Sequence, residues 1–176
     1  MKHLLIVGHI SSLAPLLCQR LSQQYHIVVL AKDVSHQAFD NTVDVFTLSE
    51  EDSFSSVMRL YQFSGILFLG SRSEQQQGMP DEENMLGYTL SMADRYKIPK
   101  IVYFTSFELS RVTAHDDERE ILLRAREQLC AVYRRQGRNV ITVRLPYVFG
   151  VGETDTFIGR LMHEAATGNA LELPLG

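Results

Sequence analysis

The sequence has little of several features that assign a protein to a class. It has no tryptophan and two cysteines among 176 residues, and the two cysteines, Cys18 and Cys130, lie far apart. This cysteine content gives no indication of a disulfide framework or a zinc site. The chain also lacks an apolar run of about 18 residues and a basic segment followed by an apolar one at its start. We therefore expect a cytoplasmic protein with no membrane partner and no signal peptide.

An excess of positive charge is missing too. The chain has 17 lysines and arginines against 21 acidic residues, a net charge of -4, whereas nucleic-acid-binding domains usually have a basic face. Five arginines do gather in and after one helical segment, but acids are interleaved among them and no aromatic platform accompanies them. They are Arg124, Arg126, Arg134, Arg135 and Arg138. This pattern predicts a solvated helix face and no nucleic-acid partner.

Short apolar runs alternate with amphipathic ones along most of the chain. The apolar runs are nearly unbroken and rich in β-branched residues, which is typical of parallel strands covered on both faces. We expect strands at residues 4–7, 27–31, 43–46, 66–69, 101–104 and 140–144, and helices at 14–24, 51–63, 81–96, 116–135 and 156–167. This alternation predicts an α/β fold with a doubly wound parallel sheet. Right-handed crossovers favour the strand order 3-2-1-4-5-6.

One domain accounts for most of the chain. We expect a nucleotide-binding domain over residues 1–150, and residues 151–176 as the remnant or the start of a second domain. In the helix at 116–135, Ile121, Ala125, Leu129 and Val132 recur at helical spacing, so we expect them to form its buried stripe. Gly137 follows as the expected stop.

The first strand leads into a turn that has lost glycines. Dinucleotide-binding folds hold pyrophosphate where the first strand meets a helix, with glycines spaced as G-x-x-G-x-x-G or nearly so. This chain has Gly8, Ser11 and Ala14 at those offsets, and Leu13 near the end of the turn. Gly8 allows the tight turn and Ala14 is small enough for close helix packing. Ser11, however, places a side chain where the backbone must approach the phosphates.

Four stretches, in the right order, resemble the extended short-chain dehydrogenase/reductase family, the NAD-dependent epimerase/dehydratase group. Residues 5–8 resemble its first strand and turn, and 84–87 its N-x-x-G helix start. Residues 100–106 resemble the strand ending in its active-site Ser or Thr, and 144–150 resemble its R-P-x-x-V-Y-G segment. The resemblance covers about residues 2–150, and its last stretch is the most specific. The family's substrate domain would still be developing at Gly176, so the chain is either a piece of a longer protein or lacks most of that domain.

The resemblance implies a Rossmann-like fold, NAD or NADP as cofactor, and a nucleotide sugar as substrate. It also implies a homodimer built on the helices at 81–96 and 116–135, packed as a four-helix bundle. These helices have apolar side chains beyond the needs of one stripe each, namely Met85, Tyr88, Met92, Leu122 and Leu129. Such a surplus is consistent with a self-complementary patch.

Three departures from the family concern the cofactor. Where the family has an acidic residue that holds the ribose hydroxyls, this chain has Lys32, followed by Asp33. Lys32 either favours a 2′-phosphate, and hence NADP over NAD, or is a solvated strand end. The family's Asp beside the adenine aligns with Thr47. Arg72 lies in the stretch after the fourth strand, where it either holds a phosphate through its planar guanidinium or is an exposed loop residue. With Ser11, these changes predict weak or absent dinucleotide binding.

The catalytic motif of the family is missing. In Y-x-x-x-K the Tyr is the general acid/base, while the Lys lowers its pKa and holds the ribose. Counting back from Glu127, which matches a helix Glu of the family, puts Arg119 at the Tyr position and Leu123 at the Lys position. We therefore expect a non-catalytic sensor, scaffold or dimerisation module. The alternative is an NAD(P)-dependent epimerase/dehydratase or reductase domain acting on a nucleotide sugar.

The remaining candidates each have a structural reading beside the functional one. Ser106 matches the family's catalytic Ser or Thr, and otherwise is a polar strand end. His9 either lines the cleft at the carboxyl ends of the strands, where ligands bind in such sheets, or is an exposed loop residue. His115 with its two following aspartates is expected to cap a helix rather than bind a metal, and both cysteines are expected to be packing residues. Tyr96 and Lys100 have the catalytic spacing only across a turn broken by proline.

Overall fold

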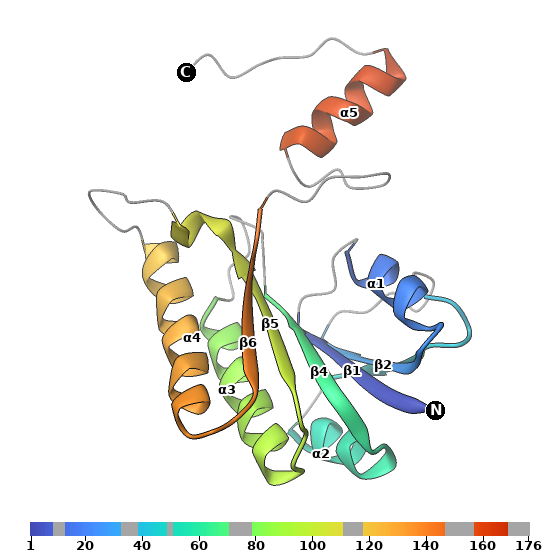
Figure 1. Cartoon of the computed structure of the whole chain (residues 1–176). Coiled ribbons are helices and arrows are strands. Elements are labelled where there is room, and N and C mark those ends of the chain that lie inside the picture. Colours follow the sequence, from blue (N-terminus) through green and yellow to red (C-terminus); the bar gives the residue numbers. More distant parts are fainter. Residues whose placement is uncertain are drawn as a thin grey trace.

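The computed structural model describes residues 1–8, 13–32, 39–48, 51–70, 79–110, 118–146 and 157–168. Six strands form one sheet in the order β3-β2-β1-β4-β5-β6, and all neighbouring strands are parallel (Figure 1). The strands are β1 (Lys2–Gly8), β2 (Tyr25–Ala31), β3 (Asp44–Thr47), β4 (Phe63–Leu69), β5 (Ile101–Ser106) and β6 (Val140–Leu145). The predicted fold class and strand order are confirmed.

The helices lie between the strands, as expected from the alternation. They are α1 (Leu13–Leu21), α2 (Glu51–Leu60), α3 (Met79–Arg95), the short 3-10 helix η2 (Phe107–Ser110), α4 (Glu118–Arg135) and α5 (Phe157–Thr167). The expected end of α2 at Phe63 was wrong, because Phe63 begins β4 and pairs with His3 of β1. Phe63 is also buried in the core, so sheet pairing decides its conformation here.

Each face of the sheet packs against its own set of helices. Alternate residues of β1 point to opposite faces: Leu5 and Val7 belong to a large core that includes side chains of α2, α3 and α4. Leu4 and Ile6 belong to a smaller core with α1. Three helices thus cover one face, and α1 covers part of the other.

The predicted buried stripe of α4 was wrong at both ends, although Leu129 packs in part against the larger core. Ile121 and Val132 are exposed, at 56% and 43%, whereas the buried residues of the helix are Leu123, Arg126 and Cys130. The helix has apolar side chains on two faces, and the charge of Arg126 made the face that packs inward look polar. The predicted stop is confirmed, since Gly137 lies just past α4 with a φ of 83°.

The helix α5 lies apart from the sheet, on the side to which the strands' carboxyl ends point (Figure 1). None of the helices in the described part of the chain is long and apolar enough to cross a bilayer.

Candidate functional site

The carboxyl ends of the parallel strands meet at one edge of the sheet. The chain runs from β1 to β2 on one side, and β4 then pairs on the other side of β1. Such a reversal of direction opens a crevice outside the strand ends, where ligands bind in open α/β sheets. Gly8, the last residue of β1, pairs in register with Leu69, the last residue of β4. These two residues therefore mark the base of the candidate site.

The backbone at Gly8 accepts no side chain. Its φ is +112°, and a Cβ built there would lie 2.2 Å from the carbonyl oxygen of Leu69. Only glycine fits both conditions. Gly8 thus ends β1 in a conformation that suits the predicted turn, whose residues 9–12 lie outside the described ranges. Ala14 of α1 is fully buried against the smaller core, which agrees with the small residue expected for close packing of α1.

The structure describes only some of the other residues predicted to lie near the cofactor. Leu13 is the first residue of α1 and is half-buried, while Lys32 is exposed just after β2 and Thr47 is exposed at the end of β3. All three lie at the carboxyl edge with Gly8. Ser11 and Arg72 lie outside the described residues, as do His9 and Asp33.

Two hydroxyls end β5 at the same edge. Ser106 is half-buried and pairs with Leu145 of β6. Its neighbour Thr105 is only 7% exposed, and the Thr105 Oγ1 has no hydrogen-bond partner among the described residues. Ser106 thus lies at the carboxyl end of β5, and its contact with a ligand stays a prediction.

The two residues of α4 that the resemblance aligns with the catalytic Tyr and Lys have no side chain suited to accept a proton. Leu123 is 2% exposed and has no titratable group. Arg119 is half-buried, and its guanidinium keeps its proton at any working pH. Neither residue offers the base that hydride-transfer chemistry needs.

Tyr96 and Lys100 lie at the opposite edge of the sheet from Ser106. Tyr96 follows the end of α3, and Lys97 has a φ of 54°, a left-handed conformation typical of a helix end. Lys100 immediately precedes β5, whose far end is Ser106. The catalytic spacing of this pair is therefore a coincidence, as predicted.

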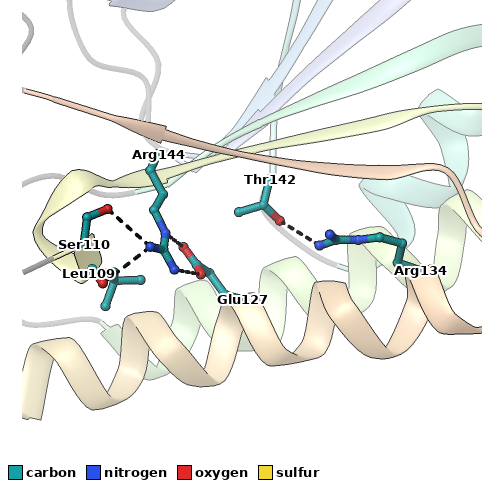
Figure 2. Close-up of polar contacts among 6 residues, drawn as sticks. All are labelled: Leu109, Ser110, Glu127, Arg134, Thr142 and Arg144. Carbon is teal, nitrogen blue, oxygen red and sulfur yellow. Dashed lines mark hydrogen bonds and ion pairs between the residues drawn. The ribbon is translucent and has the colours of Figure 1, made fainter.

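A bidentate ion pair lies beside the end of β5, and sequence reasoning missed it. Arg144 of β6 donates from Nε and Nη2 to the two carboxylate oxygens of Glu127 on α4, at 2.8 and 2.6 Å. Its Nη1 donates to the Leu109 carbonyl oxygen at 3.4 Å and to the Ser110 Oγ at 3.2 Å (Figure 2). The hydrogen bonds to Glu127 raise the pKa of Arg144 above its usual range. This contact ties β6, α4 and η2 together next to Ser106. Its signal was present, because Glu127 and Arg144 each match a residue of the family and have opposite charges.

The arginine-rich part of α4 is not one solvated face. Arg134, Arg135 and Arg138 are exposed as expected, and Arg134 donates to the Thr142 Oγ1 at 3.5 Å (Figure 2). Arg126, by contrast, is fully buried. The prediction was wrong for this residue, because the stripe that it shares with Leu123 and Cys130 packs inward.

Cysteine and metal chemistry find no support in the described residues. Burial raises the pKa of Cys18 to about 11 and that of Cys130 to about 12, so both thiols stay protonated and the packing interpretation is confirmed. No group of three or more metal-ligating side chains occurs in the described ranges. His115, Asp116 and Asp117 lie outside them.

No protein-family model matches the sequence, and no curated protein matches it either. Solved structures do. The chain is similar to the Bordetella bronchiseptica enzyme WbmH in complex with NAD+, with a TM-score of 0.75 at 12% identity over 96% of this chain and 63% of that one. A GalE-like L-threonine dehydrogenase from Cupriavidus necator gives 0.74 at 16%, over 96% and 63%. A UDP-glucose 4-epimerase from Thermotoga maritima with UDP-glucose gives 0.74 at 10%, over 98% and 65%.

The chain thus spans less than two thirds of the length of these proteins. At such identities the likeness concerns the fold, and the six parallel strands in the order 3-2-1-4-5-6 agree with it. The resemblance found in the sequence is therefore confirmed at the level of the fold: this chain has the Rossmann-like architecture of the NAD-dependent epimerases and dehydratases and the other extended short-chain dehydrogenases.

Proposed function

We propose that this chain is a Rossmann-type module that binds a nucleotide at the crevice between β1 and β4 without catalysing hydride transfer, and that it acts as a sensor, scaffold or dimerisation unit. One contrast supports this proposal. Gly8 keeps a positive φ and a close backbone approach to Leu69, whereas α4 has half-buried Arg119 and buried Leu123 where the resemblance expects Tyr and Lys.

The chemistry of these two positions favours binding over turnover. A bound NAD(P) would supply the group that accepts or donates hydride. Oxidation of a sugar hydroxyl also needs a base that takes its proton, and Arg119 is not one. Leu123 offers no charge to lower a neighbouring pKa and no donor to the ribose. Ser106 is then a hydrogen-bond donor to a bound ligand rather than part of a working acid/base pair.

The cofactor residues fit NADP better than NAD. Gly8 and Leu13 flank the segment that the resemblance assigns to the pyrophosphate, and Lys32 is an exposed cation after β2, where an acidic residue would accept the ribose hydroxyls of NAD. Lys32 is suited to a 2′-phosphate, and Arg72 is a second candidate for a phosphate. Because the sequence has Ser11 where the family's glycine lets the backbone approach the phosphates, we propose weak binding with NADPH preferred over NADH.

Calorimetric titration with NADPH and NADH tests this order. Lys32→Glu should remove the preference for NADPH, while Lys100→Glu, the same charge change at the opposite edge of the sheet, should leave it unchanged. A submicromolar affinity for NADH, or equal effects of the two variants, would contradict the proposed cofactor site.

The alternative function is an active epimerase or dehydratase domain, and one neighbour is an epimerase solved with UDP-glucose. The two functions are separated by assaying the wild type and an Arg119→Tyr/Leu123→Lys variant with NAD(P) and a panel of UDP- and dTDP-sugars. We expect no turnover by the wild type. Wild-type turnover that Ser106→Ala abolishes would refute the non-catalytic proposal.

Residues 1–150 are proposed as the binding domain, and α3 and α4 as its dimer surface. Of the five side chains expected there, Met92 is buried, while Met85, Tyr88 and Leu129 pack in part against the monomer's own core. The exposed apolar side chains of α4 are instead Ile121 and Val132. Light scattering at high micromolar concentration tests the dimer, and a monomer under those conditions contradicts it.

A further inference from the structure

Four titratable side chains meet at the amino edge of the sheet, opposite the candidate site. His3 lies at the start of β1 and pairs in register with His26 of β2. Asp44 is the first residue of β3, and Tyr61 follows the end of α2. The nucleotide-binding proposal uses none of these four residues.

Asp44 joins His26 and Tyr61, and His3 contacts the rings of both. The His26 Nε2 lies 2.6 Å from the Asp44 Oδ2, and the Tyr61 hydroxyl donates to the same oxygen at 2.7 Å. The His3 ring contacts His26 edge-on, with ring centroids 5.4 Å apart, and it lies 5.3 Å from the Tyr61 ring. The polar contact of His3 is different, because its Nδ1 lies 3.4 Å from the carbonyl oxygen of Gln62.

Two of the four groups keep a fixed charge around neutral pH. Hydrogen bonds from His26 and Tyr61, with the positive charge of the histidines, lower the pKa of Asp44, so it stays a carboxylate. Burial and the hydrogen bond to Asp44 raise the pKa of Tyr61 to about 12, so it stays a neutral donor. The other two groups are imidazoles, and imidazole in general is the side chain suited to act as a switch near physiological pH.

The two imidazoles share one carboxylate among the described residues. A single proton on the pair is balanced by Asp44, and the Nε2–H of His26 then forms a charge-assisted hydrogen bond from β2 to β3. A second proton places two like charges in ring contact against one negative charge.

We propose that His3, His26, Asp44 and Tyr61 form a proton-operated clamp on β3, which holds the strand while the histidine pair carries at most one proton and loosens it when both are charged. The strand is suited to such control. It has four residues, lies at the edge of the sheet, and pairs with β2 alone. Its last residue, Thr47, pairs with Ala31 at the carboxyl edge, so loosening β3 also changes that edge.

Hydrogen exchange tests the clamp through the amides of β3, measured by NMR from about pH 7.5 to about pH 5 after correction for intrinsic exchange. In the wild type we expect the opening equilibrium of β3 to rise roughly tenfold on acidification, because the second proton is uncompensated. His3→Gln should remove most of this rise, since the remaining histidine keeps its own carboxylate. His163→Gln, a change at an exposed histidine of α5, should behave as the wild type does.

The quantity compared is the change in β3 opening with pH, so a variant that is less stable at every pH does not imitate the effect. His26→Gln weakens the attachment of β3 at every pH, but it should also flatten the acid response. If the β3 amides of His3→Gln open on acidification as much as those of His163→Gln, the clamp does not exist. If the wild type shows no opening specific to β3 over this range, the proposal also fails.

Discussion

The two edges of the sheet fix their geometry by different means. At the carboxyl edge, the backbone of Gly8 leaves no room for a Cβ against Leu69, and the two parallel hydrogen bonds from Arg144 to Glu127 join strand and helix. At the amino edge, a half-exposed carboxylate, Asp44, collects hydrogen bonds from an imidazole and a phenol. The geometry of the carboxyl edge therefore depends on the backbone conformation, and that of the amino edge depends on the protonation state of its side chains. Substitutions should have the larger effect on stability at the carboxyl edge, and changes of pH should have the larger effect at the amino edge.

The largest effect is expected for Gly8→Ala. The new Cβ would lie 2.2 Å from the Leu69 carbonyl oxygen at a φ of +112°. The steric clash and the backbone strain together should lower the free energy of unfolding by about 3 kcal/mol or more. Urea denaturation measures this loss. Gly137→Ala is the matched control, because Gly137 also has a positive φ but nothing lies within 4 Å of its Cβ position. It should cost only about 1 kcal/mol. Equal losses would show that the contact with Leu69 does not constrain the turn.

A smaller effect is expected when the ion pair beside β5 is broken. Glu127→Gln leaves Arg144 without a carboxylate, and since the pair is bidentate but partly exposed we expect a loss of about 1 kcal/mol. Hydrogen exchange should also increase in η2, which Arg144 holds through Leu109 and Ser110. Asp94→Asn removes the more exposed pair with Arg138 and should change stability by less than about 0.5 kcal/mol. A larger effect of Asp94→Asn would reverse this order.

The smallest substitution effects at neutral pH are expected at the amino edge, where pH reveals the contacts. The pKa of Asp44 is lowered on folding, so its contribution to stability is complete above the unfolded value of 3.8 and is lost as the pH falls through the lower folded value. Asp44→Asn should therefore remove part of the acid-induced loss of stability. Denaturation curves from about pH 5 to about pH 2 measure the difference.

The contribution of Tyr61 to stability has the opposite pH dependence, because it is lost as the pH rises. Because the pKa of Tyr61 is raised from 10.0 to about 12, its contribution is complete below the lower value and is lost as the pH rises through the higher one. Tyr61→Phe should flatten the stability curve over that range. Parallel curves for the wild type and Tyr61→Phe would mean that the hydrogen bond to Asp44 does not persist in solution.

Much of this architecture could be predicted from the sequence because strands and turns have local signals. Unbroken apolar runs gave the six strands, and the glycine after the first of them gave the turn at Gly8. The inward face of α4 could not be predicted, since Ile121 and Val132 form as good a helical stripe as Leu123 and Cys130, and a buried Arg126 contradicts the usual polarity. Only the positions of the neighbouring strands decide which face is covered.

The side-chain contacts between distant segments were out of reach for a related reason. Glu127 and Arg144 were both singled out, yet for their motifs rather than for each other. The amino-edge cluster joins residues from β1, β2, β3 and the end of α2, and none of these has a motif. A rule was nevertheless available: strands that run parallel also begin at a common edge, so polar residues at their starts become neighbours.

The central place of β1 has a consequence for how the chain assembles. The strand pairs with β2, which follows soon after it, and with β4, which begins only at Phe63. During synthesis β1 therefore emerges well before one of its two partners. The backbone N–H and C=O groups on one edge of this apolar strand stay unpaired until β4 arrives. The pairing of β1 with β4 closes the longest loop among the strand pairs and raises the contact order of the sheet, whereas β5 and β6 then add outward one after the other. The nascent chain is thus most exposed to mispairing in the interval between the second strand and the fourth.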